Sequence, residues 1–443
     1  MEQKLQDVVE GRTDYSIELV REQALQKKFT VFSTFAGGGG SSTGYKLAGG
    51  DVRGIVEFQQ VGVDTYLKNY PSLGNRYFCR DIKEVEGKEV LKMIGLGEGE
   101  ELDIFDGSPP CPPFSMSGSK RKGWKQTKTV YGRQQTNIED LSFEMSRLVK
   151  EVQPKAFICE NVKGMTMDFA REHFETIKNS FKDAGYKVKH KVLNANDYGV
   201  AQGRERVFII GIRDDIIAEK QKYFGDLEIE SSPDYFPSPL EFRPTLRHAI
   251  SHLSGCERNR KEHNTIMGEI KKQKRWKYLS SMKINLEEEK YVELGAQVYK
   301  MTSEEWEALS DEEKEQNPKF AWENRETGDK VFQEKKPTEG RWKNISFVKA
   351  SGFQVRRVNW DRPSHTLTER GLQVGTSAHL HPGEHRGFTS WEARRIMSLP
   401  GDYHLEGTLN ERLARVGLMV APLQMYWLAK HIAENFLGVK YEQ

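Results

Sequence analysis

The stretch Phe29-Thr-Val-Phe-Ser-Thr-Phe-Ala-Gly-Gly-Gly-Gly-Ser-Ser-Thr-Gly44 decides the fold of this chain. Its first seven residues are rich in β-branched and aromatic side chains, which is typical of a strand. A strand, a glycine turn and a helix in this order form the layout of a nucleotide-type cofactor loop, because glycine lets the backbone approach a ligand closely. A simple tight turn is the alternative.

The next segments favour the cofactor loop. Residues 52–56, Val-Arg-Gly-Ile-Val, form a second strand that ends at Glu57, where a carboxylate can accept hydrogen bonds from ribose hydroxyls. Asp81 and Ile82 end a third segment, where they can meet an adenine edge, and residues 104–105 form a fourth strand. This order predicts an α/β fold with a doubly wound, mostly parallel sheet and one cofactor across its edge.

A proline-rich corner follows the fourth strand. Residues 103–118 read Asp-Ile-Phe-Asp-Gly-Ser-Pro-Pro-Cys-Pro-Pro-Phe-Ser-Met-Ser-Gly. Cys111 cannot lie inside a helix, because proline lacks an amide donor and disfavours helical geometry in the residue before it. We expect it on a stiff loop at the edge where open α/β sheets bind ligands. Our interpretation is a nucleophilic thiolate, and a buried, inert cysteine is the alternative.

Two further motifs lead to the same edge. Residues 156–162, Ala-Phe-Ile-Cys-Glu-Asn-Val, form a buried strand that ends in Glu160 and Asn161. The two-residue period of a strand places Gln202, Arg204 and Arg206 on one face. Two arginines there require an anion, either phosphate or Glu160, and an ordinary structural salt bridge is the alternative.

Composition limits the class of protein. The 443 residues suffice for two or three domains, and 30% charged and 37% hydrophobic residues suit a soluble globular protein. No run approaches the ~18 apolar residues of a membrane helix, and the N-terminus lacks the apolar core of a secretory signal. Four scattered cysteines without a CxxC pair argue against structural zinc and disulfides. We therefore expect no metal, no membrane and a cytoplasmic location.

The distribution of charge is more informative than the net charge of +2. Residues 115–138 carry six cations and no acid, and residues 258–277 carry eight cations and two acids. Residues 303–315 reverse the sign, with seven acids and one lysine. Local basic segments are the expected footprint of phosphate contacts, and solvated charged loops are the alternative.

The composition also divides the chain into four expected parts. The first is a lead-in at residues 1–28, and the second is the α/β domain at 29–213. A polar, lysine-rich region at 214–350 is expected to form a separate domain with insertions. Residues 351–443 are expected to complete the α/β domain, with helices near 389–399 and 420–437. Apolar periodicity predicts further helices over 141–152 and 169–184.

In their order, these motifs resemble those of the cytosine-5 DNA methyltransferases over nearly the whole chain. Residues 35–40 are similar to the family's first motif, and Pro-Cys with Phe-Ser after it to the catalytic motif. Glu-Asn-Val at 160–162 and Gln-x-Arg-x-Arg at 202–206 look like two further motifs. Residues 386–400 resemble the penultimate motif, and Gly-x-x-Val-x-Pro at 417–422 the last.

The resemblance implies a reaction and a fold. A methyl group would pass from S-adenosylmethionine to C5 of a cytosine flipped out of duplex DNA, on a methyltransferase fold with a smaller target-recognition domain at 214–350. The Cys111 thiolate would attack C6 and form a covalent adduct. Glu160, beside Asn161, would hold and protonate N3. Arg206 would bind O2, and Arg204 would help to place phosphate. The basic segment after Cys111 would close over the base.

The resemblance also implies ligand contacts, with Phe35 stacked on the adenine and Glu57 on the ribose. The expected cofactor-binding residues are Phe35, Gly37, Gly38, Gly39, Gly40, Glu57, Phe58, Asp81, Ile82, Pro110, Leu141, Leu418 and Val420. The residues expected to contact DNA are Ser115, Lys120, Arg121, Lys122 and Gln202.

Three positions depart from the family pattern. Ser33 stands where the family usually has Asp, Pro112 where it has Gln, and Leu418 where it has Asn. The family's Asn lies near the transferred methyl group and the flipped base. We therefore hypothesise a reshaped pocket in this chain, with altered activity or an unusual methionine-derived cofactor.

Other functions remain as alternatives to a DNA methyltransferase of a bacterial or phage modification system. They are a transfer-RNA cytosine-5 methyltransferase, which the large 214–350 region disfavours, and a catalytically weak DNA-binding regulator, which Cys111, Glu160 and Arg206 disfavour. A nicotinamide or flavin dehydrogenase would leave the proline-rich corner unexplained. We expect a monomer at the nucleoid that binds double-stranded DNA, with a cognate restriction endonuclease acting separately.

Overall fold

A computed structural model describes most of the chain. It covers residues 2–10, 14–97, 99–110, 128–130, 133–135, 141–223, 234–253, 356–368, 379–384 and 386–441. Between these ranges it also describes residues 262, 264, 322–324, 326–327, 330–331, 338 and 342–344. The contacts divide the chain into two compact units. Unit 1 comprises residues 1–254, 361–371 and 390–443, and unit 2 comprises residues 255–360 and 372–389.

Unit 1 is built on a seven-stranded sheet with the order β3-β2-β1-β4-β7-β10-β8. The first five strands in this order are parallel, and β10 is antiparallel to both β7 and β8. The strands are β1 Phe29–Thr34, β2 Gly50–Val56, β3 Tyr77–Phe78, β4 Ile104–Gly107, β7 Ala156–Val162, β8 Tyr186–Asn194 and β10 Glu205–Arg213. This confirms the predicted α/β class and the doubly wound, mostly parallel sheet.

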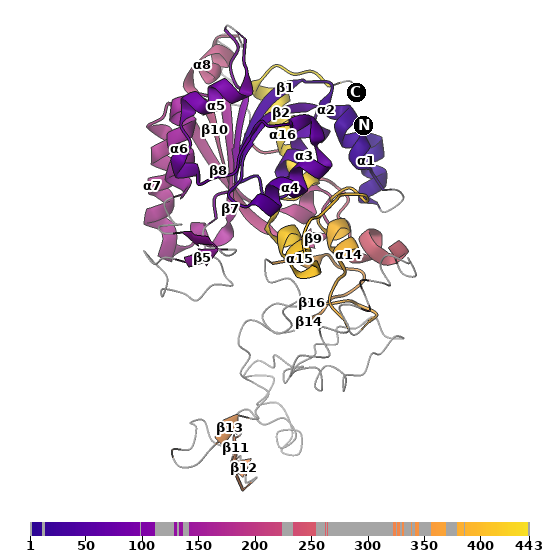
Figure 1. Ribbon diagram of the computed structural model, residues 1–443. Coiled ribbons are helices and arrows are strands. Elements are labelled where there is room, and N and C mark those ends of the chain that lie inside the picture. The colour runs from indigo at the N-terminus through magenta and orange to yellow at the C-terminus, as the bar shows by residue number, and fades with distance from the viewer. Residues whose placement is uncertain are drawn as a thin grey trace. The chain divides into compact units, whose positions relative to one another are not determined.

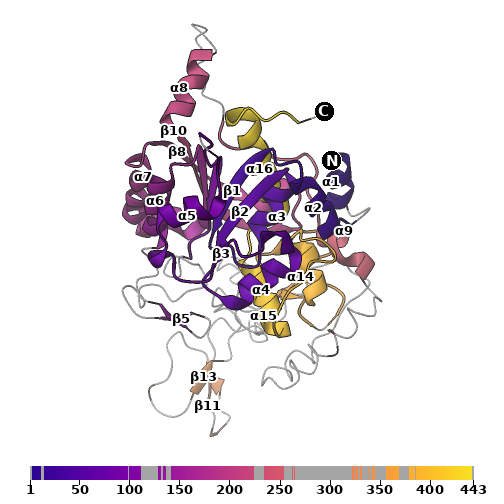
Figure 2. The same cartoon turned by 45° about the horizontal axis from the view of Figure 1, so that its top comes forward.

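Helices cover both faces of the sheet (Figures 1 and 2). On one face lie α5 Gly87–Ile94, α6 Leu141–Val152 and α7 Arg171–Lys182. On the other face lie α2 Ile17–Ala24, α3 Gly40–Leu47 and α16 Pro422–Phe436. α16 begins with proline, whose missing amide is no loss in the first turn of a helix. Because α16 comes from the end of the chain and α3 follows β1, the C-terminal part completes the sheet's covering.

One apolar core cluster lies between the sheet and the α5–α7 face. The stripe predicted on α6 is buried in it, with Leu141, Met145 and Leu148 at most 1% exposed. β10 is apolar on both faces because the sheet is covered on both sides. Burying such stripes at about 25 cal/mol per Å² is the main source of the free energy of folding.

Shorter elements connect these layers in unit 1. The helices are α1 Glu2–Val9, α4 Gln60–Asn69, α8 Asp214–Tyr223, α9 Leu246–Ile250, α14 Ser390–Ile396 and α15 Leu409–Leu418, with 3-10 turns that include η2 Ile82–Glu84 and η7 Ala195–Tyr198. β9 Gln202–Gly203 pairs in parallel with β15 Ser364–His365. β5 Lys128–Val130 and β6 Arg133–Gln135 form a separate antiparallel pair. Among the described helices, none combines the length and apolar character that a membrane crossing requires.

The described strands of unit 2 are short. β11 Trp322–Asn324 lies between β12 Lys330–Val331 and β13 Trp342–Asn344 in an antiparallel sheet, and β14 Arg356–Arg357 pairs with β16 His379–Leu380. We expected a second domain at 214–350, whereas the contacts place 214–254 in unit 1. The reason is that α8 follows β10 directly and α9 packs on α14. The assignment of a target-recognition role to this region stays a prediction.

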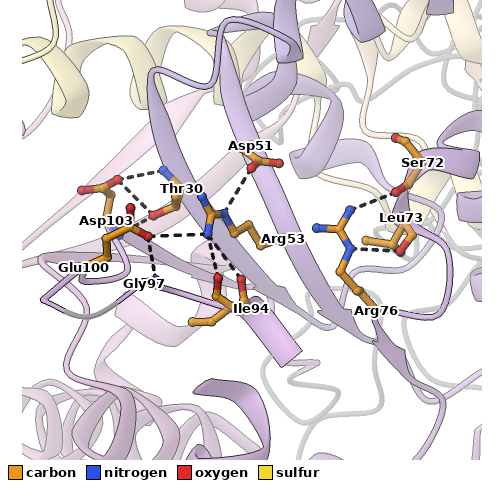
Figure 3. Close-up of polar contacts among 11 residues, drawn as sticks. Thr30, Asp51, Arg53, Ser72, Leu73, Arg76, Ile94, Gly97, Glu100 and Asp103 are labelled. Atoms are coloured by element: carbon orange, nitrogen blue, oxygen red, sulfur yellow. Dashed lines mark hydrogen bonds and ion pairs between the residues drawn. The ribbon is translucent and has the colours of Figure 1, made fainter. Parts of the chain in front are cut away.

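The amino ends of the strands are tied by local polar contacts (Figure 3). Asp103, just before β4, accepts hydrogen bonds from Thr30 N (2.8 Å) and Thr30 Oγ1 (3.0 Å) on β1. Arg53 on β2 lies 3.1 Å from Asp51 and donates to the carbonyls of Ile94 and Gly95. These contacts lie at the edge of the sheet opposite the glycine loop. The ligand is expected at the other edge, where the strands have their carboxyl ends.

Candidate active site

The carboxyl ends of β1, β2, β4 and β7 bring the predicted site residues to one edge of the sheet. Thr34 pairs with Val56 on one side and with Gly107 on the other, and Gly107 pairs with Cys159. The residues at the ends of these four strands, and those that follow them, are therefore neighbours. They include the glycine loop, Glu57, the Pro109-Pro110 corner and Glu160-Asn161.

Glu57 holds the start of the glycine loop. Its Oε2 accepts a hydrogen bond from Gly37 N (2.7 Å), and its Oε1 accepts one from Gln59 N (2.8 Å). Burial raises the pKa of Glu57, and the backbone amides of Gln59, Gly37 and Phe58 and the charge of Arg415 oppose that rise. Three backbone amides, those of Gly37, Phe58 and Gln59, thus bind this carboxylate. A carboxylate has about four acceptor sites, so it keeps capacity for a further donor such as a ribose hydroxyl.

The glycines of the loop serve two different purposes. A Cβ on Gly40 would lie 2.4 Å from the carbonyl oxygen of Val420, and one on Gly38 would lie 2.2 Å from Cε of Met419. These glycines therefore permit close packing against the segment before α16. Gly37 has a φ of +54°, and a Cβ there would meet only one atom within 4 Å, the carbonyl oxygen of Phe35. The space beside Gly37 is therefore open, and we expect the cofactor to contact the backbone there.

Phe35 is held in a rare conformation at the end of β1. Its φ is +54°, a region that costs a non-glycine residue of the order of 1–2 kcal/mol. The side chain is half-buried, and the carbonyl accepts a long contact of 3.5 Å from Ser108 Oγ. Such strain is common at ligand sites. The ring is partly buried against the apolar core, and its stacking on an adenine stays a prediction.

A buried carboxylate that the sequence analysis missed lies under this loop. Asp106 on β4 is 3% exposed, and it accepts hydrogen bonds from Ser33 Oγ (2.6 Å), Ser41 Oγ (2.8 Å) and Tyr45 Oη (3.1 Å). Burial raises the pKa of Asp106 to about 6, against the lowering effect of the three hydroxyls. The signal in the sequence was the single acid inside the apolar strand, opposite the unusual Ser33.

Tyrosines form a second support that the sequence analysis missed. The hydroxyl of Tyr403 donates to the carbonyl of Gly38. A Cβ on Gly39, whose φ is +92°, would lie 2.8 Å from Tyr403 Oη and 3.0 Å from the Tyr66 ring. The Tyr70 ring is tilted against Tyr66 and edge-on to Tyr403, and its hydroxyl contacts Thr43 Oγ1 at 2.5 Å. Tyr403 follows α14, far along the chain, so no local pattern in the sequence pointed to it.

Glu160 and Asn161 emerge from β7 with distinct partners. Arg206 Nε lies 3.1 Å from Glu160 Oε1. The two side chains form an ion pair, but the N–H bond does not point at the oxygen well enough to count as a hydrogen bond. Burial lowers the pKa of Arg206, and Glu160 opposes that shift. Asn161 Nδ2 donates to the carbonyl of Pro109 at 2.9 Å, and Asn161 Oδ1 accepts from Val162 N at 2.8 Å. The pair is thus joined to the proline-rich corner two residues before Cys111.

Arg204 and Gln202 make structural contacts within the chain, and their expected contacts with phosphate and DNA stay predictions. Arg204 is 3% exposed and donates to the carbonyls of Gly417 (2.9 Å) and Leu367 (3.3 Å). Gln202 is completely buried, and its Oε1 accepts from Leu367 N at 3.0 Å. The physical reason is the break between β9 and β10, which turns these side chains toward the returning chain. Only Arg206 reaches Glu160.

The remaining expected cofactor residues vary in exposure. Phe58 is half-buried, and Asp81 caps η2 by accepting from Lys83 N at 3.1 Å. Ile82 and Leu141 belong to the apolar core, and Val420 is 5% exposed beside Gly40. Pro110 is exposed, and Leu418 at the end of α15 is 45% exposed. The side chains of Ile82 and Leu141 are buried in the core, so the cofactor can contact them only if it reaches into the core.

Several predicted residues lie outside the described part of the chain. They are the expected nucleophile Cys111 and the expected DNA contacts Ser115, Lys120, Arg121 and Lys122. Their roles stay predictions. The described residues next to them, Pro109 and Pro110, end at the edge that carries Glu160 and Asn161.

Comparisons with known proteins agree with this arrangement. The family model for C-5 cytosine-specific DNA methylases matches residues 29–434. The type II methyltransferase M.Sau96I of Staphylococcus aureus is 28% identical over 96% of this chain and 80% of its own length. M.FnuDI of Fusobacterium nucleatum is 36% identical over 44% of this chain and 54% of its own length.

A solved structure shares the fold. It is a crystal structure of a protein described as a DNA modification methyltransferase encoded within an E. coli prophage. It aligns with a TM-score of 0.54 and 18% identity, and covers 93% of this chain and 99% of that chain. The seven-stranded sheet with its flanking helices is therefore a methyltransferase architecture.

Proposed function

The chain belongs to the C-5 cytosine-specific DNA methylase family, and from that premise we propose that it methylates C5 of a cytosine in a specific duplex DNA sequence. The relatives M.Sau96I and M.FnuDI carry the name of type II methyltransferases. We therefore place this enzyme in a bacterial or phage restriction–modification system, with a separately acting endonuclease as its counterpart. Its cofactor is S-adenosylmethionine, which supplies an electrophilic methyl group when bound.

The residues at the carboxyl edge fit that cofactor. Glu57 has acceptor capacity left for the ribose hydroxyls, and Gly37 leaves space beside the strained Phe35, whose ring stacks on the adenine. Asp81 and Phe58 complete the adenosine side of the site. The burial of Glu57 excludes water from its carboxylate and strengthens those hydrogen bonds.

Cys111 supplies the step that makes the cytosine reactive. A ring carbon of cytosine is too weak a nucleophile to take a methyl group unaided. The Cys111 thiolate adds to C6, which forms a carbon–sulfur bond and pushes an electron pair toward C5. C5 then takes the methyl group, a base removes the C5 proton, and the electron pair left behind expels the thiolate. Sulfur is therefore regenerated and the net change is one methyl for one proton.

Glu160 and its partners control the ring that Cys111 attacks. Glu160 donates a proton at N3, which draws electron density from C6 and favours the attack. Arg206 lies 3.1 Å away and fixes the position of the Glu160 carboxyl. Its Nη1 donates to the carbonyl of Glu205 at 2.8 Å, so Nη2 is the donor that we assign to O2 of the base. Asn161 fixes the distance between Glu160 and the cysteine corner, because its amide donates to Pro109.

The observation that carries this proposal is the Asn161–Pro109 hydrogen bond. It joins the strand end that bears Glu160 to the corner that leads to Cys111, with a donor–acceptor distance of 2.9 Å. A general acid and a nucleophile acting on adjacent atoms of one ring need such a fixed separation. The target base must be flipped out to enter this site. Residues 115–138 then close over it, and residues 214–350 read the major groove.

Covalent trapping tests the proposal. A duplex with 5-fluorocytosine at its target sites blocks the loss of the C5 substituent, so wild-type protein with S-adenosylmethionine should form a complex that survives denaturing electrophoresis. Cys111→Ser should form none. Cys79→Ser is the matched control, because it removes a half-buried cysteine elsewhere in the described chain, and it should trap normally.

The same assay separates the alternatives. Labelled S-adenosylmethionine is offered with duplex DNA or with transfer RNA, and label on DNA alone is expected. Label on transfer RNA alone would establish the RNA methyltransferase instead. Duplex binding with neither label transfer nor adduct would establish the regulator.

A further inference from the structure

Asp106 contacts both ends of the glycine loop through the same oxygen atom. Ser33, near the end of β1, donates to Oδ2 at 2.6 Å, and Ser41, in the first turn of α3, donates to Oδ2 at 2.8 Å. The loop at residues 35–40 lies between these two serines in the sequence. One carboxylate oxygen therefore fixes the points at which the loop leaves the strand and enters the helix.

The strand that carries Asp106 also leads to the proposed nucleophile. Asp106 is the Cα partner of Ser33 in the parallel pairing of β1 and β4. Two residues later Ser108 Oγ contacts the carbonyl of Phe35 at 3.5 Å, and Asn161 holds Pro109. The shape of the glycine loop and the course of the chain toward Cys111 thus depend on the same short strand.

We infer that Asp106 is a positioning residue that, as the carboxylate, holds both ends of the glycine loop in the shape that binds S-adenosylmethionine. The inference rests on the proposed function, because it assumes that the cofactor lies on this loop. Asp106 supplies a carboxylate from β4 next to Ser33, the position at which this chain lacks the acid expected on β1. The two residues act as a pair across the strands.

Protonation of Asp106 would weaken this hold. A neutral carboxyl group is a weaker acceptor than a carboxylate, so the hydrogen bonds from both serine hydroxyls lose their charge-assisted strength. Burial raises the pKa of Asp106 to about 6, and Glu160 on β7 adds to that rise. The other titratable groups that act on Asp106 are Tyr45 on α3 and Tyr66 on α4, which stay neutral because burial raises the pKa of each hydroxyl. Cofactor affinity should therefore fall as the pH drops through 6.

Calorimetric titration with S-adenosylmethionine between pH 5 and pH 7.5 tests this inference. The wild type should bind about fivefold to tenfold more weakly at pH 5 than at pH 7, because only about a tenth of Asp106 is ionised there. Asp106→Asn should bind weakly at every pH, and its affinity should lack the part of the pH dependence that comes from Asp106. Glu57 is present in both proteins, so any effect of its protonation is common to them. The difference between the pH dependence of the two affinities therefore reports on Asp106.

Asp103→Asn is the matched control. Asp103 lies three residues earlier, and it accepts hydrogen bonds from Thr30 of the same neighbouring strand, but at the amino edge of the sheet (Figure 3). Its substitution costs stability and should leave the affinity for the cofactor and its pH dependence unchanged. Equal losses in Asp103→Asn and Asp106→Asn would overturn the inference, since they would mark a general loss of stability.

A second pair of variants keeps the test decisive if Asp106→Asn does not fold. Ser41→Ala removes one tie and keeps the carboxylate, so the Kd should rise several-fold while kcat at saturating cofactor is kept. The exchange Ser33→Asp with Asp106→Ser returns a carboxylate to the same pair and should restore affinity. Unchanged affinity in Ser41→Ala overturns the inference. Failure of the wild type to bind S-adenosylmethionine would instead overturn the proposed function.

Discussion

The guanidinium of Arg206 and the carboxyl of Glu160 form an ion pair of 3.1 Å, with only 16% and 10% of the two side chains exposed. A buried pair of this kind is rarely a net source of stability, because both groups lose their hydration. Its value is positional. Glu160 keeps one orientation relative to the strand end, and Arg206 brings further donors to the place where the proposed base lies.

Arg206→Lys should therefore slow catalysis more than binding. Lysine keeps the positive charge but not the planar fork of donors. We expect the rate of methyl transfer at saturating DNA and cofactor to fall by roughly 100-fold, with the Kd for S-adenosylmethionine unchanged. Rapid-quench single-turnover kinetics gives this rate. Glu205→Gln is the control, because it breaks the exposed Lys163–Glu205 pair (2.9 Å) on the same strand, and surface pairs contribute little. A wild-type rate in Arg206→Lys would contradict the role given to the pair.

Asn161→Asp should break the hydrogen bond that joins the end of β7 to Pro109, two residues before Cys111. The substitution removes the amide donor to Pro109 and sets a carboxylate against a carbonyl, at a cost of about 1–3 kcal/mol in the free energy of unfolding. Urea denaturation measures that cost, and the rate of trapping by 5-fluorocytosine DNA should fall as well.

Asn196→Asp is the control for this prediction. Asn196 Nδ2 donates to the carbonyls of Pro244 (2.8 Å) and Val200 (2.9 Å), so this substitution also removes a buried amide donor from a proline carbonyl. It should lose similar stability and keep the trapping rate. Slower trapping in both variants, in proportion to stability, would show that Asn161 has no special part in the reaction.

Alanine substitutions should separate the two kinds of glycine in the loop. Gly40→Ala would place a Cβ 2.4 Å from the backbone oxygen of Val420, which cannot move aside as a side chain can. We expect a loss of about 1–3 kcal/mol in stability. Gly37→Ala faces open space, so its folding cost is limited to about 1 kcal/mol for the positive φ, but its cofactor affinity should fall. Thermal unfolding and calorimetric titration measure these effects, and the reverse pattern would refute the division.

Leu418→Asn should change function without changing stability. The Leu418 side chain is 45% exposed at the end of α15, so the free energy of unfolding should stay within about 0.5 kcal/mol. If Leu418 reshapes the pocket, the asparagine expected from the family pattern should raise the rate with S-adenosylmethionine. Steady-state turnover tests this. An efficient wild type that Leu418→Asn does not improve would count against a reshaped pocket.

The stability of the protein should depend on Asp106 in a defined direction. Its pKa is about 6 in the folded chain and 3.8 ordinarily, so the folded state keeps a proton that the unfolded state has lost between these values. Stability therefore falls as the pH rises from about 4 to about 6, by about 3 kcal/mol. Urea denaturation at pH 4.5 and pH 8 should show that Asp106→Asn lacks this decrease. Parallel curves for the two proteins would contradict the assignment.

Much of the fold follows from local patterns in the sequence. The stripe over residues 141–152 predicted α6 with the ends that the structure has, and the strand at 156–162 is β7. These segments are periodic or uniformly apolar and are buried accordingly, so pattern and packing agree. The helix expected at 389–399 begins and ends slightly inside those bounds, at Ser390 and Ile396.

The polar interior of the site was harder to predict because it depends on distant segments. Val420 limits position 40 to glycine, Met419 lies against Gly38, and Tyr403 lies against Gly39. All three return to the loop from the end of the chain. Gln202 and Arg204 were placed on one face by strand periodicity, but the break after β9 directs them to Leu367 and Gly417. The sequence does show Asp106 as an acid inside an apolar strand. Its role becomes clear only when the structure places it beside Ser33 on the neighbouring strand.

The most direct test of the central claim is peptide mapping of the covalent complex with 5-fluorocytosine DNA. After digestion of protein and DNA, mass spectrometry locates the residue that carries the modified base. The account predicts one adduct, on the peptide that contains Cys111, with the added mass of the fluorinated, methylated nucleotide. An adduct on another cysteine, or efficient methylation of DNA by Cys111→Ser, would contradict it.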